Sequence, residues 1–205
     1  MEEKKELMRQ IKDEVVDLKK SPLYKYRTEN NYLPVIGEGS HNAKIMFIGE
    51  APGRNEAKTG RPFCGAAGRV LDQLLENAGI KREEVYITNI VKDRPPENRD
   101  PSPEEIKIYG PFLDRQIEII QPKIIATLGR YAMGYVMTKL SLEDKLEPIG
   151  KMHGRVFAVP EEALAKLGYK GCEVKVVPLY HPCVAVYNPH NLDSLKKEFE
   201  VLKDL

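Results

Sequence analysis

The chain has 205 residues, of which 41% are hydrophobic and 31% are charged, and its formal net charge at pH 7 is +1. This composition argues against general disorder and predicts a substantial core, while the balanced charge gives no indication of a nucleic-acid partner. No apolar run approaches the ~20 residues of a membrane-spanning helix, and the charged start MEEKKELMRQ is unlike a signal peptide. We therefore expect a cytoplasmic protein with no membrane contact.

Three cysteines occur at positions 64, 172 and 183. Their odd number and the lack of CxxC spacing argue against a disulfide framework and against a cysteine-based metal site. We expect no bound metal.

The first half of the chain begins with Leu7, Ile11 and Val15 at helical spacing and continues with a short apolar run, KIMFIG. A second helical pattern follows, which Gly79 is well suited to end. The predicted elements are a helix over about 3–19, a polar surface connection over 20–43, a strand over 44–49 and a helix from about 66 to 78.

The second half of the chain alternates apolar runs with helical patterns. Ser102 and Glu105 form a capping-box pattern, and Pro103 occupies the favoured first helical position. The predicted elements are strands over 85–91, 123–129 and 174–180, a short extra strand over 156–159, and helices over 103–120, about 130–140 and 191–203.

Strands that alternate with helices are typical of parallel sheets covered on both faces. We predict an α/β fold: one three-layer α/β/α domain over 1–205, built around a four-stranded, mostly parallel sheet, with the N-terminal helix within 1–20. Ligands of such folds bind at the carboxyl ends of the strands. Those ends carry the most unusual segments of this chain.

The first of these segments is GEAPGRNEAKTGRPFCGAAG, residues 49–68. Its glycines allow close approach of a ligand to the backbone, and the helix that begins near Ala66 would present free N–H groups to an anion. Glu50 and Glu56 add carboxylates, and Phe63 adds a flat apolar face. An ordinary glycine-rich turn with Phe63 in the core explains the same residues, and neither common nucleotide-binding glycine motif is present.

Asn89 and His181 follow two other predicted strands. The Asn89 amide places a donor beside an acceptor, which matches the edge of a pyrimidine, although asparagine is also a common turn former. His181 could donate a hydrogen bond to a developing oxyanion, although a lone histidine is more often structural. The proline-rich loop after Asn89 carries Arg94 and Arg99, which suit phosphates or a solvated charged surface.

Three separated motifs, GEAPGRNEAKTGRPFCGAAG, TNIVKDRPPENRDPSPEEI and LYHPC, together resemble the uracil-DNA glycosylase superfamily. The similarity is greatest to family 4, the iron–sulfur-containing enzymes of archaea and bacteria. It implies a single α/β/α domain and a monofunctional hydrolase of base-excision repair that flips uracil out of DNA.

The resemblance also implies roles for individual residues. Gly49 and Ala51 belong to the wall of the base pocket, Phe63 stacks on the flipped uracil and Asn89 reads its edge. Glu50, Glu56 and His181 are the catalytic candidates: a glutamate positions water or stabilises the sugar cation, and the histidine stabilises negative charge on uracil O2. Which glutamate acts on the water is left open.

The same resemblance makes DNA the expected partner. Arg94 and Arg99 are expected to contact it, and the segment from Pro182 and Val184 to Tyr187 is expected to enter the minor groove as a wedge. We expect a monomer, and a sliding clamp is a partner that the sequence leaves open.

The chain departs from family 4 at the cluster. Members of the family hold a [4Fe–4S] cluster with four cysteines, and the corresponding positions here are Leu18, Ser21, Asp93 and Tyr109. Because thiolates hold such clusters, we predict that the cluster is absent. Apolar packing is expected to replace it as a structural clip, with these candidates: Leu18, Leu23, Tyr24 and Tyr109.

Two further departures, Ala57 and Cys183, suggest an alternative, a glycosylase for another deaminated base, hypoxanthine or xanthine. The missing cluster suggests a second alternative, a DNA-binding relative that has lost turnover.

Overall fold

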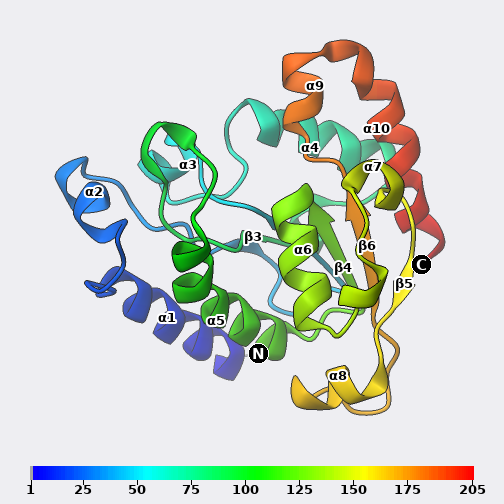
Figure 1. Cartoon of the computed structure of the whole chain (residues 1–205), viewed down its shortest axis with the longest axis horizontal. Helices are drawn as coiled ribbons and strands as arrows, with labels where there is room; N and C mark the ends of the chain where they lie inside the picture. Colours follow the sequence, from blue (N-terminus) through cyan, green and yellow to red (C-terminus); the bar gives the residue numbers. More distant parts are fainter. Residues whose placement is uncertain (1) are drawn as a thin grey trace.

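A sheet of six strands runs through the middle of the computed structural model, which describes residues 2–205 (Figure 1). The strand order is β1-β3-β2-β4-β6-β5. The inner four strands are parallel to one another, and β1 and β5 pair antiparallel at the two edges. The strands are β1 (Glu38–Gly39), β2 (Ile45–Gly49), β3 (Tyr86–Asn89), β4 (Ile124–Leu128), β5 (Phe157–Ala158) and β6 (Lys175–Leu179).

The predicted α/β fold is confirmed, but the predicted count of four strands is wrong. The inner four strands are the four main strands expected from the sequence, and β5 lies within the short extra strand over 156–159. β1 was not anticipated, because two residues are too few to give a detectable alternation of apolar and polar positions. The inner strands are buried along almost their whole length because helices cover both faces.

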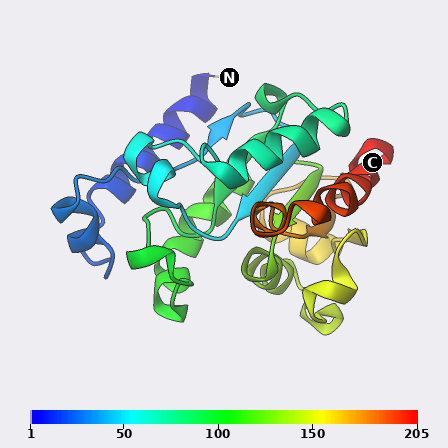
Figure 2. The same ribbon diagram turned by 90° about the horizontal axis from the view of Figure 1, so that it is seen from above.

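The sheet faces differ in the helices that cover them (Figures 1 and 2). In β2, Met46 and Ile48 point to one face, and Phe47 points to the other. The first face is covered by α1 (Glu2–Val16), α5 (Pro103–Ile120), α6 (Arg130–Lys139), α7 (Ile149–Met152) and α8 (Glu161–Lys166). The second is covered by α4 (Ala66–Asn77), α9 (Cys183–Tyr187) and α10 (Leu192–Phe199).

Local sequence signals set several helix ends as predicted. The Ser102 hydroxyl accepts from the Glu105 N–H, and the Glu105 carboxylate accepts from the Ser102 N–H, so α5 begins with a complete capping box. Gly79 follows α4 with φ at 69°, a conformation that favours glycine. None of the helices within residues 2–205 combines the length and apolar character that crossing a bilayer requires.

Two short helices lie in segments that were predicted to be loops. α2 (Tyr24–Glu29) interrupts the expected surface connection over 20–43; Arg27 within this helix and Leu23 just before it are buried. α3 (Arg54–Thr59) lies inside the glycine-rich segment and ends at Gly60. Helical turns of the 3₁₀ type complete the chain at Arg82–Glu84, Pro96–Asn98, Glu143–Lys145, Pro189–Asn191 and Glu200–Asp204. The extent of the single domain, 1–205, stays a prediction.

Candidate active site

A cavity of about 560 Å³ opens at the carboxyl ends of the parallel strands. Glu50 follows β2, Gly129 and Arg130 follow β4, and His181 follows β6, so the topology gathers them at one edge of the sheet. The complete lining is Glu50, Ala51, Asn98, Asp100, Gly129, Arg130, Ile149, Tyr180, His181, Cys183, Val184 and Tyr187. The predicted location of the site at this edge is therefore matched by a cavity there.

His181 is held in one tautomer by its own turn. Its Nδ1 accepts a hydrogen bond of 3.1 Å from the backbone N–H of Cys183, at the start of α9. Burial lowers the pKa of His181 from 6.5 to about 4, and the charge of Glu56 opposes that shift only in part. At neutral pH the ring is thus uncharged, its proton is on Nε2, and Nε2–H is available as a donor.

Glu50 also lines the cavity, and its pKa is shifted in the opposite direction to that of His181. Burial and, to a smaller extent, the negative charge of Asp100 raise its pKa from 4.5 to about 7, and the charge of Arg130 opposes the rise. The carboxyl group therefore changes its ionisation state near neutral pH. A group poised in this way can accept a proton from water once it is ionised.

Phe63 lies directly behind His181. The two ring centroids are 5.5 Å apart, with 33° between the planes. Its backbone has φ at 46°, a conformation that is unfavourable for a side chain of this size, and its carbonyl approaches Gly68 so closely that a Cβ there would lie 1.9 Å from the oxygen. Gly68 thus allows Phe63 to fold back against α4.

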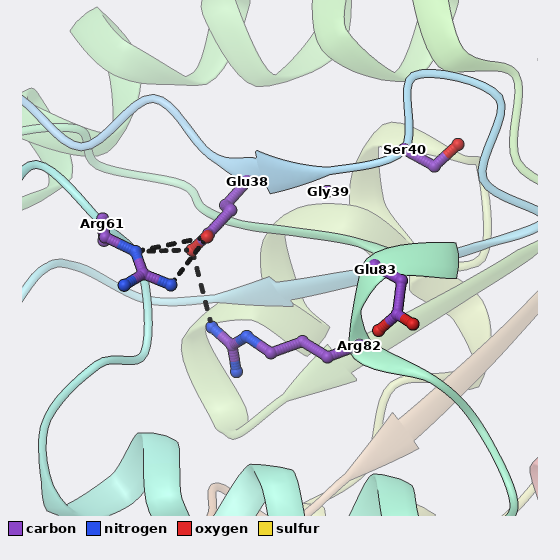
Figure 3. A pocket seen from close by; sticks show the side chains of 6 residues that line it. All are labelled: Glu38, Gly39, Ser40, Arg61, Arg82 and Glu83. Carbon is purple, nitrogen blue, oxygen red and sulfur yellow. Dashed lines mark hydrogen bonds and ion pairs between the residues drawn. The ribbon is translucent and has the colours of Figure 1, made fainter.

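Arg82 holds this strained segment from the other side. Its Nη2 donates to the carbonyls of Pro62 at 2.8 Å and Phe63 at 3.2 Å, and its Nη1 donates to Asp72 at 2.7 Å. Figure 3 shows Glu38 between Arg61 and Arg82, with its carboxylate 2.8 Å from Arg61 Nη2 and 3.9 Å from Arg82 Nη2. Arg61, Arg82 and Glu38 line a second cavity of about 510 Å³. The two guanidinium groups there are already paired.

Asn89 ends β3, and its side chain meets the Phe63 ring beside Gly49. A Cβ on Gly49 would lie 2.3 Å from Asn89 Oδ1 and 2.8 Å from Phe63 Cζ, so only glycine fits where these two side chains meet. Asn89 is 2% exposed, and its Oδ1 has no hydrogen-bond partner within residues 2–205. An unpaired buried oxygen costs about 1–3 kcal/mol, which a ligand donor at this position would recover.

A buried lysine lies below Asn89. Lys92 Nζ donates to the Asn89 carbonyl at 2.6 Å, to Gln116 Oε1 at 2.6 Å and to Thr88 Oγ1 at 2.8 Å. Burial lowers its pKa well below the usual value. Lys92 therefore supports the end of β3.

Glu56 does not line the cavity and is bound to the backbone of its own loop. Its Oε1 accepts from the backbone N–H groups of Cys64 at 3.0 Å and Gly65 at 2.8 Å. These bonds fix the loop that carries Phe63 and satisfy donors at the start of α4. Glu56 therefore positions this loop, its catalytic role stays a prediction, and Glu50 is the glutamate that lines the cavity.

The predicted DNA-contacting residues fall into two groups. Arg94 is 4% exposed, and it donates to the hydroxyls of Tyr26 and Tyr32 and to Asn98, so the expected phosphate contact is corrected to a buried brace. Arg99 is exposed but forms an ion pair of 2.6 Å with the buried carboxylate of Glu105.

The segment after His181 is arranged differently. Pro182 is buried, and Val184 lines the cavity from α9. Tyr187, at the end of α9, is 87% exposed. The wedge expected over this segment remains a prediction, and Tyr187 is its most accessible side chain.

The family model of the uracil DNA glycosylase superfamily matches residues 36–205. This chain belongs to that superfamily. It is 45% identical to a type-4 uracil-DNA glycosylase of Sulfurisphaera tokodaii over 97% of this chain and 84% of the relative. It is 40% identical to that of Archaeoglobus fulgidus (94% and 89% covered) and 41% identical to that of Thermotoga maritima (92% and 88% covered).

The iron–sulfur cluster that the family-4 resemblance implies does not fit the residues present. Three of the four corresponding positions are joined by hydrogen bonds, because the Tyr109 hydroxyl contacts both Ser21 and Asp93. The fourth, Leu18, is buried in the same core as Tyr109. They offer hydroxyl, carboxylate and apolar groups where a cluster needs thiolates. Among residues 2–205, no group of three or more His, Cys, Asp or Glu side chains is placed to hold a metal ion.

Proposed function

We propose that this chain is a uracil-DNA glycosylase, a monofunctional hydrolase that removes uracil from DNA in base-excision repair. The observation that carries the proposal is the meeting of Phe63, the unpartnered Asn89 oxygen and a neutral His181 at the strand ends beside Glu50. The type-4 relatives, named as uracil-DNA glycosylases, support it.

A base inside a duplex cannot reach a recess of this kind, so it must be flipped out at a cost of a few kcal/mol. Tyr187 and Val184 on α9 lie at the rim of the cavity, where a side chain can fill the gap left in the stack. Stacking of the flipped base on Phe63 returns ~1–3 kcal/mol.

The edge of the base is read by Asn89. Uracil presents N3–H beside a carbonyl oxygen, and the asparagine amide offers an acceptor and a donor in the matching arrangement. The acceptor is the oxygen that is buried without a partner. Occupation by uracil removes that penalty, whereas a base without an N–H at this point leaves it in place.

Cleavage breaks the bond between uracil N1 and the sugar C1′, and the bonding electrons leave with the base. The His181 Nε2–H is the donor that stabilises the charge that develops on uracil O2. The sugar becomes oxocarbenium-like, and water attacks C1′ as its proton passes to the ionised Glu50. These steps use side chains of this chain alone.

We propose DNA as the macromolecular partner, a monomeric enzyme and action in the cytoplasm. Contact with a sliding clamp stays open and is tested by pull-down with that clamp.

The proposal is tested by base release from oligonucleotides that carry uracil, hypoxanthine or xanthine at one position, with thymine as the control. We expect release of uracil. Release of hypoxanthine or xanthine alone would support the alternative that Ala57 and Cys183 suggest. Binding of the uracil oligonucleotide without release, at enzyme in excess over DNA, would support the relative that has lost turnover.

A further inference from the structure

Asp93 is the centre of a buried network that joins three distant segments. Arg27 Nη1 donates to both Asp93 carboxylate oxygens at 3.2 Å, and Tyr109 OH donates to Asp93 Oδ2 at 2.5 Å. Arg27 comes from α2, Asp93 from the loop after β3 and Tyr109 from α5. Each of the three is at most 5% exposed, so the ion pair is largely shielded from water.

No fully buried side-chain polar atom of Ser21, Arg27, Asp93 or Tyr109 lacks a hydrogen-bond partner. Because Tyr109 gives its proton to Asp93, the 2.7 Å contact between Ser21 Oγ and Tyr109 OH requires Ser21 to donate. Ser21 Oγ in turn accepts from the Leu23 N–H at 3.1 Å. Arg27 donates to the carbonyls of Val15 and Val16 at the end of α1 as well. The network is thus complete without a further ligand.

The network continues toward the candidate active site. Arg94, next to Asp93, donates at 3.0 Å to each of the hydroxyls of Tyr26 and Tyr32 and at 2.7 Å to Asn98 Oδ1. Asn98 lines the 560 Å³ cavity, as does Asp100 in the same loop. The N-terminal segment is therefore bonded, through two adjacent residues, to the loop that forms one wall of the site.

We propose that Ser21, Tyr109, Asp93 and Arg27 form a metal-free cross-link that positions the loop 93–100 beside the site, in place of an iron–sulfur cluster. The expected apolar contacts are only part of this arrangement, since Leu18, Leu23 and Tyr109 are buried together. The ion pair and the hydrogen bonds fix how the three segments lie against one another. A buried ion pair costs desolvation, and burial accordingly raises the pKa of Asp93. The hydrogen bonds from Tyr109 and Arg27 oppose that rise and offset part of the cost.

The first test is the composition of the full-length protein, purified without oxygen from cells supplied with iron and cysteine. We expect iron and acid-labile sulfide far below stoichiometric amounts and no broad absorbance near 400 nm. A stoichiometric cluster would overturn the proposal. This measurement uses no DNA, so its result is independent of whether uracil is the substrate.

The second test compares Tyr109→Phe with Tyr135→Phe. Tyr135 OH also donates to a carboxylate, Asp114 Oδ1 at 2.9 Å, but from α6 and outside the network. In Tyr109→Phe we expect amide hydrogen exchange to accelerate roughly tenfold in both 18–27 and 93–100, the effect of losing a hydrogen bond to a charged group. In Tyr135→Phe exchange in these segments is expected to stay unchanged.

A positioning role also predicts how catalysis responds. This expectation rests on the proposed function. Tyr109→Phe should raise KM for a uracil oligonucleotide by about threefold or more and leave kcat within about twofold. The reason is that the loop 93–100 moves while the reacting groups stay in place. Unchanged exchange in 93–100 in Tyr109→Phe would overturn the positioning role, whatever the activity. Equal acceleration in Tyr135→Phe would overturn it too, because the effect would then be a general loss of stability.

Discussion

Two buried polar regions of this chain differ in how completely their hydrogen bonds are formed. Around Asp93, no fully buried side-chain polar atom of the network lacks a partner. At the carboxyl ends of the strands, Asn89 Oδ1 has none, Phe63 has a strained backbone, and burial raises the pKa of Glu50 and lowers that of His181.

This difference in hydrogen bonding distinguishes side chains that stabilise the fold from side chains that bind a ligand. Satisfied buried groups stabilise, whereas unpaired or wrongly ionised ones cost stability and are retained where a substrate completes them. Substitution at the strand ends should therefore cost activity with little or no loss of stability. Substitution in the Asp93 network should cost stability and loop order first.

The largest effect is expected for Glu50→Gln. Loss of the base should lower the single-turnover rate of uracil release by about 10²–10⁴-fold. Because the folded pKa of Glu50 is raised from 4.5 to about 7, its burial costs stability as pH rises through that window. The variant should therefore have a higher Tm than the parent at pH 8 and an equal Tm below pH 4.5. Glu143→Gln, at an exposed position, is the control; a lower Tm for Glu50→Gln at pH 8 would break the comparison.

His181→Ala should lower the same rate by about 10²–10³-fold, because one donor to the developing charge is lost. His190→Ala, at an exposed position nine residues along the chain, should leave the rate unchanged. If His181→Ala lowers the rate by less than about tenfold, His181 does not stabilise the charge that develops in the chemical step.

Phe63→Leu keeps an apolar side chain but removes the flat face. We expect kcat/KM to fall by about 5- to 150-fold, equivalent to the ~1–3 kcal/mol of base stacking. Phe157→Leu in β5 is the matched control, since Phe157 is also buried but lies in the core of the other face. Equal losses in both variants would mean that the effect is one of packing.

The pH profile should show the ionisation of Glu50. With a pKa of about 7, the ionised fraction and hence the rate should rise about tenfold from pH 6 to pH 8. Asp100→Asn should move the midpoint to lower pH, because the charge of Asp100 raises the pKa of Glu50. A flat profile in the parent enzyme would exclude Glu50 as the base.

The smallest effect is expected for Arg82→Met, which removes the donors to the carbonyls of Pro62 and Phe63. We expect kcat/KM for uracil release to fall by about three- to tenfold, the cost of about one net hydrogen bond. Arg61→Met in the same cavity loses only its pair with Glu38 and should have no effect (Figure 3). If the two variants behave alike, the Phe63 loop does not depend on Arg82.

Local patterns in the sequence were sufficient for the inner strands and for the ends of α4 and α5, because apolar runs, a capping box and a glycine act over a few residues. The convergence of Glu50, Phe63, Asn89 and His181 followed from the rule that parallel strands end at one edge, together with the family resemblance. The structure brings these four residues to the same edge.

Long-range pairings had no such signal. Arg27 and Asp93 are 66 positions apart, and nothing local distinguishes them from the exposed charges around them. Arg82 reaches back to Phe63 from a turn that looks solvated in the sequence, and Glu56 turned to backbone N–H groups within its own loop. Burial of a charge depends on a partner that only the folded chain supplies.

The two edge strands, β1 and β5, have a consequence for concentrated solutions. Each is two residues long and antiparallel to its neighbour, so each side of the sheet offers little unpaired backbone to another molecule. Long, flat edges recruit strands from other chains and begin aggregation. The short edges of this sheet oppose such growth.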